Sequence, residues 1–188
     1  MEDQEHYCRS VETFPPEKFL QLGIDKGENI LILGEAPAPN GWRKSGKAFY
    51  TPDGKLLPTG KNLNKLLSRL NLSVEICGFT ELVKCYPGKN RKLLETCGIK
   101  CWPIFLKQLK ATNYSLIIIL GVKTLDIFNK LTNNRSKLGK LSDVVIDGKK
   151  YNVLPIYHPS PIAPFNHSRN TTIFNRLRKE LLTLIESP

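Results

Sequence analysis

Two side chains with acid–base chemistry follow short apolar runs in this chain. Glu35 follows the run at residues 30–33, and His158 follows the run at residues 153–156. In open α/β sheets, ligands bind beyond the carboxyl ends of the strands. Taken singly, the first could be a solvated carboxylate in a turn and the second a structural histidine. Because each follows an apolar run, we expect Glu35 and His158 to converge on one cleft.

The thiols form a second group with chemical potential. The chain contains five cysteines: Cys8, Cys77, Cys85, Cys97 and Cys101. An odd number without a secretory signal argues against a disulfide scaffold. Cys97 and Cys101 are four residues apart on an expected helix and therefore share one face, and Cys85 precedes that helix. Such a group could hold an iron–sulfur centre or zinc, although there is no C-x-x-C pair. Buried, inert thiols are the alternative.

The elements that would position these groups alternate along the chain. Strands are expected at residues 29–33, 74–84 and 116–120, in a hairpin of 144–146 with 151–153, and in a last core strand ending at His158. Helices are expected at 62–72, 93–110, 122–131 and 171–185, and a further one is expected to begin at 16–20. Loops are expected at 39–59, with a small hairpin at 49–56, and at 161–170. Strands that alternate with helices indicate a three-layer α/β fold.

The composition is that of a basic globular protein. There are 28 Lys and Arg against 17 Asp and Glu, which gives a net charge of +11. The excess is spread over residues 43–65, 84–92, 135–150 and 169–179, which suits a phosphate backbone, although it could also serve solubility. No apolar run approaches the roughly 20 residues of a membrane-spanning helix, and the polar N-terminus is no secretory signal. We therefore expect a cytoplasmic protein.

Several short motifs occur in one order. They are GEAP at 34–37, SGKAF at 45–49, VKCYPGKNR at 83–91 followed by Cys101, LG at 120–121 and HPS at 158–160. Together they resemble the uracil-DNA glycosylase superfamily, most closely its iron–sulfur branch (family 4), over about residues 8–180. The resemblance implies a single domain, 1–188, with a three-layer α/β/α fold around a central, mainly parallel four-stranded sheet.

The resemblance also implies an activity. These enzymes flip a deaminated base, most typically uracil, out of DNA and hydrolyse its N-glycosidic bond in base excision repair. By resemblance, His158 stabilises the leaving base, Phe49 stacks on it and Glu35 orients the water. The implied base pocket further includes Ala36, Pro37, Glu81 and Ser160. The implied DNA contacts are Lys84, Lys89, Asn90, Arg91, Pro159 and Arg169.

Two positions depart from the family pattern around the base. Ala38 stands where the family has Gly, and Asn40 stands where acidic residues are common, so the water site would depend on Glu35 or Asn40. Glu81 stands where the family has an Asn that reads uracil O4 and N3–H. An ionised carboxylate only accepts hydrogen bonds, so it suits N3–H and clashes with O4. Glu81 would better meet the amino group of cytosine or adenine, or act only when protonated.

The implied cofactor is one [4Fe–4S] cluster. By resemblance, Cys8, Cys85 and Cys101 are ligands, but Glu5 stands where the family has a further Cys. Cys97, one helical turn from Cys101, or else His6 would be the fourth ligand. The implied partner is DNA, single- or double-stranded, without a membrane; we expect a monomer associated with the nucleoid.

Other functions stay open at this point. The chain could be a nucleic-acid-binding protein on the glycosylase fold with weak activity, or a glycosylase for a different base. A nucleotide- or flavin-binding α/β module also fits the sheet, but no G-x-G-x-x-G or Walker motif supports it.

Overall fold

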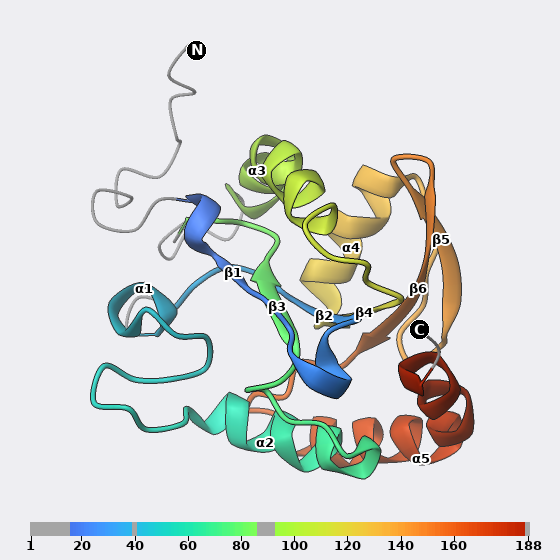
Figure 1. Ribbon diagram of the computed structural model, residues 1–188. Helices are drawn as coiled ribbons and strands as arrows, with labels where there is room; N and C mark the ends of the chain where they lie inside the picture. Colours follow the sequence, from blue (N-terminus) through green and yellow to red (C-terminus); the bar gives the residue numbers. More distant parts are fainter. Residues whose placement is uncertain (1–15, 39–40, 86–92, 187–188) are drawn as a thin grey trace.

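A six-stranded mixed sheet forms the centre of the computed structural model, which describes residues 16–38, 41–85 and 93–186 (Figure 1). The strands are β1 (Leu20–Gln21), β2 (Ile30–Gly34), β3 (Gly78–Glu81), β4 (Leu116–Leu120), β5 (Ser142–Ile146) and β6 (Lys149–Ile156). Their order across the sheet is β1-β3-β2-β4-β6-β5. The four inner strands are parallel, and β1 and β5 are antiparallel at the two edges.

Helices cover both faces of this sheet. They are α1 (Trp42–Ser45), α2 (Pro58–Leu67), α3 (Leu93–Leu109), α4 (Val122–Thr132) and α5 (Pro164–Glu186). Helices α2 and α5 lie on one face, and α3 and α4 lie on the other (Figure 1). None of the helices in the described ranges is long and apolar enough to cross a membrane.

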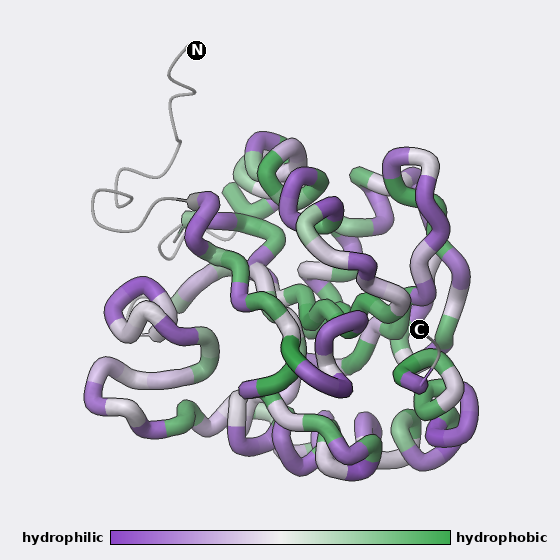
Figure 2. Tube along the Cα trace, viewed as in Figure 1, coloured by the Kyte–Doolittle hydropathy of each residue, from purple (hydrophilic) through white to green (hydrophobic). Residues whose placement is uncertain are grey.

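The two inner apolar strands explain this layering. All five residues of β2 and all five of β4 are buried, because successive side chains point to opposite faces and both faces are covered. Ile30 and Ile32 pack toward α2 and α5, whereas Leu31 and Leu33 pack toward α3 and α4. Figure 2 shows these strands as hydrophobic segments at the centre of the molecule, between helices that also carry hydrophilic residues.

The predicted α/β/α layers around a mainly parallel sheet are confirmed, but within the described residues the sheet has six strands and not the predicted four: each edge carries one strand beyond the four parallel ones. At the β5 edge, this strand comes from the predicted hairpin. At the other edge, one prediction is wrong: the helix expected to begin at 16–20 is a single 3-10 turn at Pro16–Lys18. The chain then extends because Leu20 pairs with Thr80 of β3.

Three boundaries also differ from the sequence-based expectation. Of the strand expected at 74–84, only β3 (Gly78–Glu81) is formed. The hairpin expected at 49–56 is reduced to a single bridge between Tyr50 and Leu56. The last helix begins at Pro164 and not at residue 171. Proline suits the first helical position, where its missing N–H costs no hydrogen bond. The loop between β6 and α5 is therefore shorter than expected.

Candidate active site at the carboxyl ends of the parallel strands

A cavity of about 180 Å³ opens where the inner strands end. Its lining includes the last residues of β2, β3 and β4 and the loop that follows β6. The cavity brings together five of the residues expected from sequence: Glu35, Ala36, Phe49, Glu81 and His158. The expected convergence of Glu35 and His158 is therefore observed.

Glu35 is held by the continuation of strand pairing past the end of β2. The carbonyl of Gly34 accepts from Leu82 N–H and the carbonyl of Glu35 accepts from Val83 N–H, both at 2.9 Å. The backbone that carries the acidic side chain is therefore held on one side by the segment that follows β3. Pro37 is buried and does not line the cavity. Asn40, the other candidate for the water site, lies outside the described residues.

Phe49 has an unusual backbone conformation. Its φ angle is +64°, in the left-handed region that bulky residues rarely adopt. Its carbonyl accepts from Leu57 N–H at 2.7 Å, and its ring centroid lies 4.3 Å from that of Phe79. Strain of this kind persists where the surrounding structure imposes it, and it is concentrated at functional sites. The loop thus holds the aromatic ring at the cavity wall.

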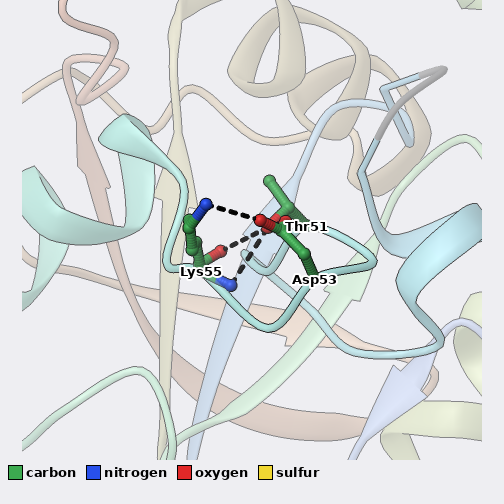
Figure 3. Close-up of polar contacts among 3 residues, drawn as sticks. All are labelled: Thr51, Asp53 and Lys55. Atoms are coloured by element: carbon green, nitrogen blue, oxygen red, sulfur yellow. Dashed lines mark hydrogen bonds and ion pairs between the residues drawn. The ribbon is translucent and has the colours of Figure 1, made fainter.

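A tight turn closes the loop that carries Phe49 (Figure 3). Thr51 Oγ1 donates to Asp53 Oδ1 at 2.5 Å and accepts from Lys55 N–H at 3.0 Å. Lys55 Nζ also lies 2.8 Å from Asp53 Oδ2. The exposed ion pair contributes little, so the hydrogen bonds of Thr51 define the turn.

His158 is exposed, and polar side chains of α5 hold its backbone. Asn170 Oδ1 accepts from Tyr157 N–H at 2.9 Å, and Asn170 Nδ2 donates to the Tyr157 carbonyl at 2.7 Å. Asn166 Nδ2 donates to the His158 carbonyl at 3.1 Å. The imidazole therefore projects from a backbone that is fixed on both sides.

The loop after His158 separates a buried anchor from an exposed tip. Pro159 is buried and its carbonyl accepts from Asn62 Nδ2 of α2 at 3.0 Å, so the predicted contact of Pro159 with DNA is wrong for this conformation. Ser160 Oγ accepts from Ile162 N–H at 3.3 Å and does not line the cavity. The side chain of Ile162 is 91% exposed.

Glu81 lies at the end of β3 with 8% of its surface exposed, and it lines the cavity. Its Oε2 atom is buried and has no hydrogen-bond partner within the described ranges. Burial raises the pKa of Glu81 to about 8; nearby Lys84 acts to lower it and Glu35 acts to raise it. A Cβ atom on Gly34, the residue paired with Glu81, would overlap this carboxyl group. The predicted place of Glu81 in the pocket is therefore observed.

Lys84 is fully buried, so its predicted contact with DNA is wrong. Its ammonium donates to Thr80 Oγ1 at 2.6 Å, to Gln108 Oε1 at 2.5 Å and to the carbonyl of Glu81. Burial lowers the pKa of Lys84 to about 7. The residue therefore ties the end of β3 to α3.

The other predicted DNA contacts divide into two groups. Arg169 is exposed, with its guanidinium 5.1 Å from the ring centroid of Tyr157. Lys89, Asn90 and Arg91 lie outside the described residues.

Two of the predicted cluster ligands lie together. A hydrogen bond from the Cys85 thiol lowers the pKa of Cys101 to about 7, and Lys84 N–H donates to Cys101 Sγ at 3.3 Å. A thiolate favoured in this way is what a metal ligand requires. The described parts of the chain hold no group of three His, Cys, Asp or Glu able to bind a metal, so Cys97 does not join this pair. Cys8 lies outside the described residues.

Five residues of the cavity were missed by sequence reasoning: Gly41, Trp42, Leu57, Thr59 and Phe79. Phe79 and Glu81 are two residues apart on β3 and therefore share a face, which is a signal that could have identified Phe79. Trp42 lies 5.1 Å from Phe79 between ring centroids. It belongs to a helix of four residues, which is too short to show a periodic pattern.

Comparison with known proteins agrees with this geometry. A family model described as the Uracil DNA glycosylase superfamily matches residues 23–182. A type-4 uracil-DNA glycosylase of Saccharolobus solfataricus is 35% identical over 143 residues, covering 73% of this chain and 63% of that protein. A type-4 uracil-DNA glycosylase of Archaeoglobus fulgidus is 32% identical over 146 residues, covering 75% and 69%.

The match spans a little under two thirds of the length of the first of these relatives. The family-model match, at residues 23–182, includes strands β2 to β6 and every described residue that lines the cavity. The chain belongs to the uracil DNA glycosylase superfamily.

Proposed function

We propose that this chain is a DNA N-glycosylase that removes uracil from DNA, in the pathway of base excision repair. The observation that carries the proposal is the convergence of Glu35, Phe49 and His158 on one cavity from three separate loops. An acid–base pair and an aromatic wall are the groups that hydrolysis of an N-glycosidic bond requires. The names of the relatives support uracil as the base.

The chemistry follows from the position of each group. Uracil leaves with both electrons of the bond between N1 and the sugar C1′, so negative charge develops on the base. His158 donates a hydrogen bond to uracil O2 and stabilises this charge more in the transition state than in the substrate. Glu35 orients the water that adds to C1′ and accepts its proton. Phe49 stacks on the ring and holds it in the cavity.

Access to the cavity requires that the base leave the helix. A cavity of about 180 Å³ can receive one base but not a duplex, so the target nucleotide must be flipped out. Ile162 and Phe165, in the segment that follows His158, are 91% and 77% exposed. Apolar side chains inserted between base steps help to unstack them. We propose that these two side chains insert between the bases next to the flipped nucleotide.

The residues fit the implied [4Fe–4S] cluster in part. The hydrogen bond between Cys85 and Cys101 supports these two as ligands, and the resemblance supplies Cys8 as the third; within the described residues, Cys85, Cys97 and Cys101 do not form a group of three ligands. Such a cluster would tie the N-terminal segment to α3 through its thiolate bonds. No step of base removal is assigned to it.

The test is incubation with oligonucleotides, single- and double-stranded, that carry uracil, hypoxanthine, xanthine or a mismatch, followed by alkaline cleavage at abasic sites. Cleavage at uracil that requires His158 supports the proposal. Tight DNA binding without cleavage of any substrate overturns it and favours a nucleic-acid-binding protein on the same fold.

A further inference from the structure

The wall of the cavity contains an acidic side chain, Glu81, whose ionised form would not suit uracil. Glu81 and Phe79 project from the same face of β3 into the cavity, where the Phe79 ring packs against that of Phe49. Uracil presents O4 as an acceptor and N3–H as a donor. A carboxylate has no donor for O4, whereas a neutral carboxyl group has one O–H donor and one acceptor, like an amide.

We propose that Glu81 binds uracil as a neutral carboxylic acid and donates to O4 through an O–H on the carboxyl oxygen that faces the cavity. This inference rests on the proposed function. A neutral acid can present either polarity, so acceptance of uracil depends on the proton. Rejection of cytosine must come from other groups.

The surroundings of Glu81 favour the neutral form. Its Oε2 atom is enclosed and without a partner within the described ranges, which is costly for a charge but tolerable for a neutral group. The nearest cation, Lys84, directs its donors to Thr80, Gln108 and the backbone carbonyl of Glu81. A carboxylic acid kept neutral in an apolar site, so that it can donate, is a known catalytic device.

Gly34 makes room for this group. A Cβ at residue 34 would overlap Oε2 of Glu81 and would also lie 3.0 Å from the Phe79 ring. The carboxyl group therefore sits tightly against β2, with its remaining exposure on the cavity. Because the two oxygens of a carboxyl group are chemically equivalent, the proton can reside on the oxygen that faces the base.

The titratable groups around Glu81 are Glu35 and His158 of the cavity wall and Lys84 beneath the strand. Glu35 and Lys84 oppose each other in their effect on Glu81, and burial dominates, so its pKa is about 8. Uracil excision should therefore decline as the pH rises through about 8. At pH 9 about a tenth of Glu81 remains neutral, which predicts about a tenfold loss relative to pH 7.

The experiment compares single-turnover uracil excision by the wild-type chain with Glu81→Gln and Glu81→Asn, from about pH 6.5 to about pH 9.5. Both amides keep a donor and an acceptor at every pH, so they should lack the alkaline loss of about tenfold. Glu95→Gln, which removes an exposed carboxylate paired with Lys130, should keep the wild-type profile. The DNA substrate, including the ionisation of uracil itself, is common to all four proteins. Parallel profiles for wild type and both amides overturn the inference.

Binding of free uracil, measured by calorimetry over the same pH range, separates this inference from the proposed function. If no protein excises uracil but wild type alone loses uracil binding above about pH 8, the proposed function fails and the inference stands. If excision occurs with identical profiles, the inference alone fails. If there is neither excision nor binding, both fail.

A stability measurement tests the proton without any substrate. The folded pKa of Glu81 lies above its unfolded value, so the folded chain binds more protons between about pH 4.5 and about pH 8. The stabilisation is complete below this window and is lost as the pH rises through it. The melting temperature of wild type relative to Glu81→Gln should fall across that window. A constant difference would contradict a neutral Glu81.

Discussion

In the proposed mechanism, His158 is critical for turnover although it lies outside the core. It is exposed, and Asn166 of α5 anchors its backbone. Its proposed hydrogen bond strengthens only as charge develops on the departing base, so its loss should affect the transition state more than the bound substrate.

We therefore predict that His158→Ala lowers single-turnover excision by roughly a hundredfold or more, because removal of one donor to a developing anion costs about 10²–10³ in rate. DNA affinity, measured by fluorescence anisotropy, should change little. Equal turnover in the variant and the wild type would remove His158 from the mechanism.

Glu81 and Lys84 mark the limit of sequence reasoning at this scale. Glu81 ends the short strand β3, Lys84 follows it by three residues, and both are charged. The pattern could place Glu81 by its distance from the Lys84–Cys85 motif, but it could not show that Lys84 turns inward. That outcome depends on Gln108 of α3, which lies 24 residues away in sequence and supplies an acceptor for the ammonium. A basic motif alone therefore suggested a surface contact where the fold places a buried anchor.

At the scale of elements, continuous apolar runs were the strongest signals. β2 and β4 were predictable because a strand buried on both faces needs an unbroken apolar run. β1 was not, because two residues carry no period and its formation depends on pairing with β3. The residues of the cavity were predictable to the same unequal extent. Glu35 and His158 lie on loops that follow predictable strands, whereas Trp42 lies on a short helix that has no periodic pattern.

The contact between α5 and the His158 loop leads to a prediction about positioning. Asn166→Ala removes the hydrogen bond to the His158 carbonyl, which contributes only about 1 kcal/mol to stability. A small displacement of the imidazole is more costly for catalysis, since misplacement of about 1 Å can reduce a rate up to a hundredfold. We expect kcat to fall about tenfold with a nearly unchanged KM and melting temperature.

Thr172→Ala is the matched control, because Thr172 is exposed on the same helix and its hydroxyl bonds only to the backbone of Ser168 in the preceding turn. It should leave kcat unchanged. An equal decline in both variants would show that α5 acts through general stability.

At the scale of the whole molecule, the proposed cluster would link two parts of the chain that are distant in sequence. If Cys8, Cys85 and Cys101 hold a cluster, anaerobically purified protein should be brown and contain about four iron atoms per chain. Cys85→Ser and Cys101→Ser should lose the iron. Cys97→Ser should retain it, since Cys97 does not join the pair. Colourless, iron-free protein after reconstitution would leave inert thiols as the explanation.

The net charge of +11 acts over the whole surface, but only charges near the cavity should contact bound DNA. Lys61 is exposed on α2, one residue before Asn62, whose side chain binds the loop after His158. Lys149 begins β6 at the amino end of the parallel strands, whereas the cavity lies at their carboxyl ends. These two lysines therefore form a matched pair that differs in distance from the site.

Each phosphate contact contributes about −0.9 to the slope of log affinity against log salt concentration. Lys61→Gln should therefore weaken DNA binding and make this slope shallower by about 1, because one released counterion is lost. Lys149→Gln should leave the slope unchanged, although it lowers the net charge by the same amount. The measurement is fluorescence anisotropy with a uracil-containing duplex across a salt series. If both variants shift the slope equally, DNA binding depends on the total charge of the molecule, and the carboxyl edge of the sheet is not the docking face.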